Sequence, residues 1–138
     1  MDLVSQHIEN QVKITNQNNP EGVVERIVVG LCEQMNIKEE KFGNILLALT
    51  EAVDNAIEHG NKNNPEKAVE LSYKTSDTGV TFTIADQGTG FNPAQVSDPT
   101  HPESVSEEGR GLFVMKLLAD KVAFEENGKK VVLSFNLN

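Results

Sequence analysis

Hydrophobic and polar positions repeat with two different periods along this chain, and each period predicts a type of element. Between residues 38 and 59, apolar residues recur at spacings of three and four, which is typical of an amphipathic helix. They alternate with polar residues at 69–74, 80–84 and 131–135, which is typical of half-buried strands. A shorter alternation from Gln11 to Thr15 predicts a first strand.

Capping residues and turns mark the ends of these elements. Asn19-Pro20 predicts a helix start, because Asn can cap and Pro suits the first helical position. Gly60 is placed to end the 38–59 helix as a left-handed C′ residue. A third helix is predicted from about Arg110 to Ala119. Val122 and Phe124 begin a last strand pair that turns at Asn127-Gly128, and Ser76–Gly79 is a second hairpin turn.

The resulting order is β-α-α-β-β-loop-α-β-β. Strands joined mostly by hairpins predict a mixed, largely antiparallel sheet, and three amphipathic helices can cover one of its faces. We therefore expect a two-layer α/β sandwich that forms a single domain over residues 1–138.

Composition narrows the choice of partner. The 138 residues carry a formal charge of −9, from 21 acidic and 12 basic side chains. This charge repels nucleic acid and anionic membrane surfaces but permits a basic protein or a Mg²⁺-shielded nucleotide. The N-terminus shows no secretory signal and no apolar stretch is long enough to span a bilayer, so we expect a cytoplasmic protein. The histidines lack zinc-ligand spacing and are expected to be structural or exposed.

The first candidate motif is Glu51-Ala-Val-Asp-Asn55, inside the 38–59 helix. Glu51 and Asn55 are four residues apart, so their side chains share one helical face. An Asn amide oxygen suits Mg²⁺, and a neighbouring Glu can orient or deprotonate a nucleophile. Asp54 is a second carboxylate, expected to be solvated or to support the first.

The second motif is Asp86-Gln-Gly88-Thr-Gly90, directly after a predicted strand. A carboxylate at a strand end can accept a hydrogen bond from an exocyclic amine, and glycines let the backbone approach a flat base. The third motif is Gly109-Arg110-Gly111, at the start of the last helix. Helix N-termini favour phosphate, and Arg110 adds a charged donor. The polar, acidic loop from Asn92 to Glu108 is expected to form a lid over the nucleotide.

Each motif taken alone also has an ordinary structural interpretation. The Glu51–Asn55 pair could be a solvated polar pair, and the two glycine motifs could be a turn and a flexible helix entry. Their fixed order and their placement on a helix, a strand end and a helix start favour an ATP site without a Walker-type loop.

The same residues resemble the N box and the two glycine boxes of the GHKL ATPase/kinase superfamily. The segments Thr50–Ile57, Phe91–Pro93, Asp98–Glu103 and Gly109–Met115 further resemble the anti-sigma factor serine kinases of the RsbW and SpoIIAB type. The resemblance covers about Gln11 to Leu137. It implies the Bergerat fold, an ATP-dependent serine kinase, and alternate binding of a sigma factor and an anti-anti-sigma protein with a STAS domain. It also implies a homodimer.

The resemblance assigns a role to each motif residue. Asn55 would hold Mg²⁺ on the phosphates, and Glu51 would be the general base for a serine hydroxyl. Asp86 would bind the adenine amine in a pocket shaped by Gly88 and Gly90. The phosphates would contact three consecutive residues, Gly109, Arg110 and Gly111. A rival hypothesis keeps the same pocket in an ATP-gated binding module without useful catalysis, and the presence of Glu51 favours the kinase.

Overall fold

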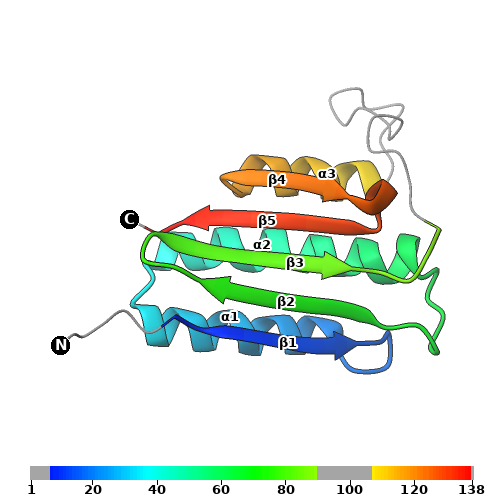
Figure 1. Ribbon diagram of the computed structural model, residues 1–138, viewed down its shortest axis with the longest axis horizontal. Helices are drawn as coiled ribbons and strands as arrows, with labels where there is room; N and C mark the ends of the chain where they lie inside the picture. Colours follow the sequence, from blue (N-terminus) through cyan, green and yellow to red (C-terminus); the bar gives the residue numbers. More distant parts are fainter. Residues whose placement is uncertain (1–6, 90–106, 138) are drawn as a thin grey trace.

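The computed structural model describes residues 7–89 and 107–137, which form a five-stranded sheet and three α-helices in the predicted order. All three helices lie behind the sheet in Figure 1, so the fold has two layers and no described helix covers the other sheet face. The elements are β1 (Glu9–Ile14), α1 (Pro20–Met35), α2 (Glu39–Asn55), the π-helical turn η1 (Ala56–Gly60), β2 (Val69–Thr75), β3 (Gly79–Ala85), α3 (Glu107–Leu118), β4 (Lys121–Glu125), the 3₁₀ turn η4 (Glu126–Gly128) and β5 (Lys130–Asn136).

The strand order is β1-β2-β3-β5-β4, and every pairing among the described residues is antiparallel. The predicted α/β sandwich is therefore confirmed, but the expectation of a mixed sheet is wrong for these residues. The connections explain the difference. Helices α1 and α2 return the chain to the end where β1 stopped, so β2 runs back beside it. The single helix α3 makes β3 and β4 run the same way, but β5 lies between them (Figure 1).

The core lies between the sheet and the helices. Alternate strand residues point into it, and Phe82 and Phe135 meet edge-on there with ring centroids 6.0 Å apart. The predicted alternation of β2, β3 and β5 is thus confirmed by burial. Burying side chains of this size contributes about 1.5–3 kcal/mol each. The helices cover them with Val24, Val28 and Leu31 of α1, Ile45, Leu49, Ala52 and Val53 of α2, and Leu112 and Met115 of α3.

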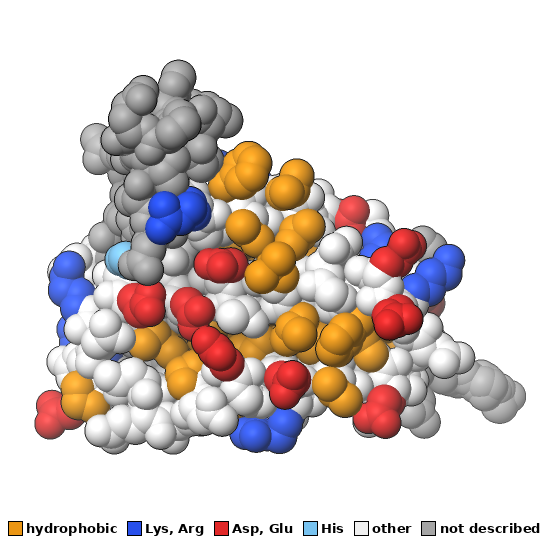
Figure 2. All heavy atoms as spheres, turned by 180° about the vertical axis from the view of Figure 1, so that it is seen from behind, with side chains coloured by type: hydrophobic (Ala, Val, Ile, Leu, Met, Phe, Trp, Pro, Cys, Tyr) orange, Lys and Arg blue, Asp and Glu red, His pale blue; other side chains and the backbone are white. Residues whose placement is uncertain are grey.

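The first helix begins as its cap predicts. The side chain of Asn19 accepts a hydrogen bond from the backbone N–H of Gly22, with Pro20 as the first helical residue. Among the described residues, no helix combines the length and the apolar character that a bilayer crossing needs. Figure 2 shows the helical layer from behind, with apolar side chains along α3 and α2 and acidic side chains beside them.

The second helix ends differently from the prediction. Its last turn widens into η1, where the N–H of Asn61 donates to the carbonyl of Ala56, five residues back, at 2.8 Å. Gly60 has no left-handed φ, so the predicted C′ role is wrong. Gly60 is needed for space instead, because a Cβ there would collide with the Asp86 carboxylate. Such π-helical turns are frequent at functional sites.

Candidate nucleotide-binding site

The first and third motifs meet where α3 crosses α2. Glu51 and Asn55 are half-buried on the side of α2 that faces α3, and the backbone of Gly111 packs directly on them. A Cβ on Gly111 would lie 2.8 Å from Nδ2 of Asn55 and 3.1 Å from Oε2 of Glu51. A side chain at this position would displace both groups, so the close approach requires glycine.

The second motif lies at the end of β3, beside the π-helical turn. The Asp86 carboxylate accepts a hydrogen bond from the N–H of Gly88 at 2.8 Å, and its own backbone N–H donates to the carbonyl of Lys129 at 2.8 Å. Burial raises the pKa of Asp86, and the Gly88 hydrogen bond and the charges of Lys129 and Lys67 oppose this rise. Asp86 is therefore held in one orientation by the backbone, with its second oxygen directed toward Gly60.

Asn55 of the first motif and Asp86 of the second line one pocket between α2, α3 and the β4–β5 turn, and Leu112, directly after the third motif, lines it too. Its cavity of about 40 Å³ is far smaller than the roughly 300 Å³ or more of a typical ligand pocket, so a purine enters only if the walls separate. Gly90 and most of the predicted lid lie outside the described residues. The walls consist of Ala52, Asn55, Ala56, His59, Gly60, Ile84, Asp86, Leu112, Met115, Phe124, Gly128, Lys129 and Val131.

The third motif lies within α3 rather than before it. The helix begins at Glu107, so the expected start near Arg110 is wrong, and Gly109 to Gly111 occupy its first turns. Gly109 and Gly111 are buried, whereas Arg110 is exposed. Only the first four N–H groups of a helix are available to an anion, so Gly109 and Arg110 remain candidates for phosphate contact, whereas Gly111, the fifth helical residue, lies beyond them.

Three further residues near the pocket lie outside the three motifs. The Nε2 atom of His59 is buried and has no hydrogen-bond partner among the described residues, so a nucleotide in this pocket would offer it one. Lys129 supplies both a carbonyl and a positive charge next to Asp86. Asn61 is 98% buried and joins η1 to the loop after β3, because its Oδ1 accepts the N–H of Gln87 at 2.7 Å. Its position directly after the helix was the only hint in the sequence.

We expect Asn61→Ala to destabilise the fold by about 1–2 kcal/mol, because it leaves the Gln87 N–H without its acceptor. It should also weaken ATP binding, since the loop that carries Asp86 loses its tie to η1. Urea unfolding and calorimetric ATP titration measure the two effects. Gln34→Ala, at an exposed amide of α1, is the control. Equal stability of the two variants would show that the Asn61 bond contributes nothing.

A second group of carboxylates lies on the outer side of α2. Burial, and then the negative charges of Glu58, Glu21 and Glu51, raise the pKa of Asp54 from its usual 3.8 to about 6. The folded state therefore disfavours the ionised form. The resulting loss of stability develops between pH 4 and pH 6 and persists at higher pH.

Asp54→Asn should consequently raise the free energy of unfolding at pH 8 by about 1 kcal/mol, a value reduced for the screening of a half-buried charge. The gain should be much smaller at pH 4, where Asp54 is protonated in the folded state and only partly ionised in the unfolded state. Urea unfolding at both pH values is the measurement, with Glu33→Gln on α1 as the control. A gain that is the same at pH 4 and pH 8 would contradict this explanation.

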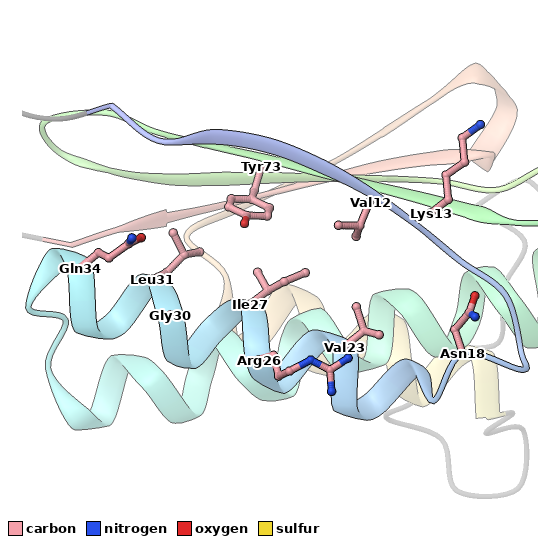
Figure 3. Close-up of a pocket in the computed structure, with 10 residues that line it drawn as sticks. All are labelled: Val12, Lys13, Asn18, Val23, Arg26, Ile27, Gly30, Leu31, Gln34 and Tyr73. Atoms are coloured by element: carbon pink, nitrogen blue, oxygen red, sulfur yellow. The ribbon is translucent and has the colours of Figure 1, made fainter.

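A larger hollow lies away from the three motifs. It is a groove of about 580 Å³ between the edge strand β1 and α1, with Val23, Ile27 and Leu31 on the helix side and Val12 and Tyr73 on the sheet side (Figure 3). None of the motif residues lines it. The smaller pocket is the better candidate for a nucleotide, because the Asp86 carboxylate and the Asn55 amide of the motifs both line it.

Comparison with known proteins agrees with this fold. The family model described as the histidine kinase-like ATPase domain matches residues 14–135, so the chain belongs to that family. It is 24% identical over 136 residues to the serine-protein kinase RsbW of Bacillus subtilis, covering 93% of this chain and 85% of that protein. It is 26% identical over 133 residues to the anti-sigma F factor of Clostridium beijerinckii, covering 92% and 93%. A third relative, the anti-sigma F factor of Bacillus cytotoxicus, is 34% identical over 104 residues, covering 72% and 70%.

Proposed function

We propose that this protein is an ATP-dependent protein serine kinase and anti-sigma factor. It phosphorylates a serine of a STAS-domain anti-anti-sigma protein and, in alternation, sequesters a sigma factor. The observation that carries the proposal is the close packing of Gly111 of α3 against the Glu51 carboxylate and the Asn55 amide, and Asn55 shares a pocket with Asp86.

The donor set suits Mg-ATP. Asp86 binds the adenine amine, and Gly88 and Gly90 let the base lie close to the backbone. The phosphates lie at Gly109 and Arg110. No group of three or more His, Cys, Asp or Glu side chains among the described residues could hold a metal by itself. Mg²⁺ commonly takes only one or two protein ligands and completes its shell with phosphate oxygens and water, so Asn55 is a sufficient protein ligand. The metal neutralises phosphate charge.

Glu51 acts as the general base of the proposed reaction. The serine oxygen forms a bond to the γ-phosphorus as the bond from that phosphorus to the ADP oxygen breaks, and Glu51 takes the hydroxyl proton. Such transfers depend mainly on positioning and charge neutralisation. The close approach of α3 to α2 at Gly111 supports such positioning, because phosphates bound at this part of α3 would lie beside the Glu51 carboxylate.

Names of relatives support the rest of the proposal. Proteins called serine-protein kinase and anti-sigma F factor align with most of this chain. We extend both activities to it, together with a cytoplasmic location, a homodimer and a single ATP-binding domain over residues 1–138. Light scattering of the purified protein tests the homodimer.

The direct test is incubation with Mg-ATP and a recombinant STAS-domain protein, followed by mass spectrometry. We expect a phosphoserine on the STAS protein that is absent when EDTA is added. A pull-down with and without ATP identifies the sigma factor. Tight ATP binding with no phosphoserine on any co-purified partner would favour the rival hypothesis, an ATP-gated binding switch.

A further inference from the structure

Three apolar side chains remain exposed on the helical layer next to the candidate site. Leu47 of α2 is 48% exposed, and Phe113 and Leu117 of α3 are 44% and 66% exposed. Phe113 and Leu117 are four residues apart, so they share one side of α3. We call these three residues the α2–α3 patch. Figure 2 shows apolar side chains gathered along these two helices on the face away from the sheet.

The α2–α3 patch borders Glu51. Leu47 is one helical turn before Glu51 on the same side of α2. Gly111 of α3 contacts Glu51, and α3 runs antiparallel to α2, so Phe113 and Leu117 extend from that contact in the direction of Leu47 (Figure 1). A molecule resting on the patch would therefore reach the proposed base.

The opposite side of Glu51 is acidic. Asp54 of α2 and Glu58 of η1 follow it along the chain, and Glu21 of α1 is close enough to act on Asp54. The charged groups that perturb Asp54 are all carboxylates, and each of them disfavours its ionised form. Like charges held together lower the stability of the isolated protein, and a cationic partner would relieve that cost.

Building on the proposed kinase function, we propose that this face docks the protein substrate, and that the substrate carries its serine between an apolar residue and a basic residue. The order along α2 and the η1 turn that continues it is Leu47, Glu51, then Asp54 and Glu58. A segment lying along the helix would place its apolar residue on the α2–α3 patch, its serine at Glu51 and its basic residue at Asp54 and Glu58. Charge complementarity disfavours a substrate with an acidic residue in place of the basic one, because the acidic residue would meet like charge in a protein of net charge −9.

Binding of two synthetic peptides tests this proposal without requiring any phosphoryl transfer. Each labelled peptide has one serine with two leucines on one side, and two arginines or two glutamates on the other. Fluorescence anisotropy at low salt should show that the arginine peptide binds about tenfold more tightly. The difference should shrink in 0.5 M salt, where exposed charges are screened.

Matched variants separate the two halves of the surface. Leu117→Asp should weaken binding of the arginine peptide several-fold, whereas Val29→Asp, at an exposed apolar residue of α1, should not. The double variant Asp54→Asn with Glu58→Gln should remove the preference for arginine over glutamate. Equal binding of the two peptides, an equal effect of Leu117→Asp and Val29→Asp, or no binding at 1 mM (about 4 kcal/mol) would overturn the proposal.

The outcome is distinguishable from failure of the kinase function. ATP affinity, measured by calorimetry on each variant, should not change, since none of the substituted residues lines the nucleotide pocket. If the wild-type protein phosphorylates no STAS protein but shows the peptide preference, the docking surface stands and the kinase assignment fails. If it phosphorylates the STAS protein and Leu117→Asp leaves KM unchanged, the docking surface fails and the kinase assignment stands.

Discussion

Replacement of Glu51 by alanine should reduce phosphoryl transfer to a STAS protein by about 10²–10⁴-fold, the range typical of losing a general base. ATP binding should persist, because the variant leaves in place Asp86, which we expect to bind the adenine, and the backbone amides of α3, which we expect to bind the phosphates. The carboxylate contacts Gly111 at the point where α3 begins its packing on α2, so its removal leaves space and no clash. Single-turnover phosphorylation and calorimetric ATP titration measure the two effects.

The control for this experiment is Glu40→Ala, which removes an exposed carboxylate from the first turn of α2. It should transfer phosphate at the rate of the wild-type protein. Unchanged transfer in Glu51→Ala would remove Glu51 from the mechanism. Loss of ATP binding together with transfer would instead assign Glu51 to nucleotide binding and favour the ATP-gated switch.

Asp86→Asn should lower ATP affinity roughly 100-fold, or about 3 kcal/mol. The carboxylate has two acceptors, and one already accepts the N–H of Gly88. An Asn side chain keeps one acceptor and gains a donor, so either the Gly88 N–H or the adenine amine loses its partner. Calorimetry measures the affinity, and the same variant should lose phosphoryl transfer at low ATP concentration.

The control is Asp77→Asn, which makes the same change in the turn at the other end of β3. Circular dichroism checks that both variants fold. If Asp86→Asn retains wild-type affinity for ATP while its fold is intact, the adenine does not bind where we place it. Recovery of transfer at high ATP would confirm that the defect is one of binding.

The hydrophobic alternation and the capping residues correctly predicted those elements whose pattern depends only on one buried face or on one helical turn. The alternation in β2, β3 and β5 follows from one buried sheet face, and the Asn19 cap acts within one turn of α1. The end of α2 could not be predicted in this way. Glycine is a common residue at helix ends, but Gly60 is required here because its missing side chain leaves space for Asp86, which is distant in the sequence. The start of α3 was also predicted too late in the sequence, because glycines near the start of a helix are more typical of a loop.

The same distinction applies to the site. Glu51, Asn55 and Asp86 could be predicted as site residues from the sequence, because these polar side chains have glycines or small residues near them. His59 continues the four-residue spacing of Glu51 and Asn55, but it lies in the π-helical turn η1, and its place in the pocket depends on that turn. Lys129 lies in the β4–β5 connection and reaches the pocket only through folding, so no periodic pattern encodes its position. The closed volume of the pocket was equally invisible, because it depends on how far α3 lies from β5.

The position of β5 between β3 and β4 has a consequence for folding. Its pairing with β3 must bring together segments separated by residues 86–129, a non-local closure that is entropically costly and slow compared with hairpin formation. Asp86 begins that separation and Lys129 ends it, and their backbones are joined by a hydrogen bond. The nucleotide pocket thus exists only once this closure is complete. ATP would bind only the fully paired sheet and would stabilise it over partly folded states, by an amount that grows with the ATP concentration.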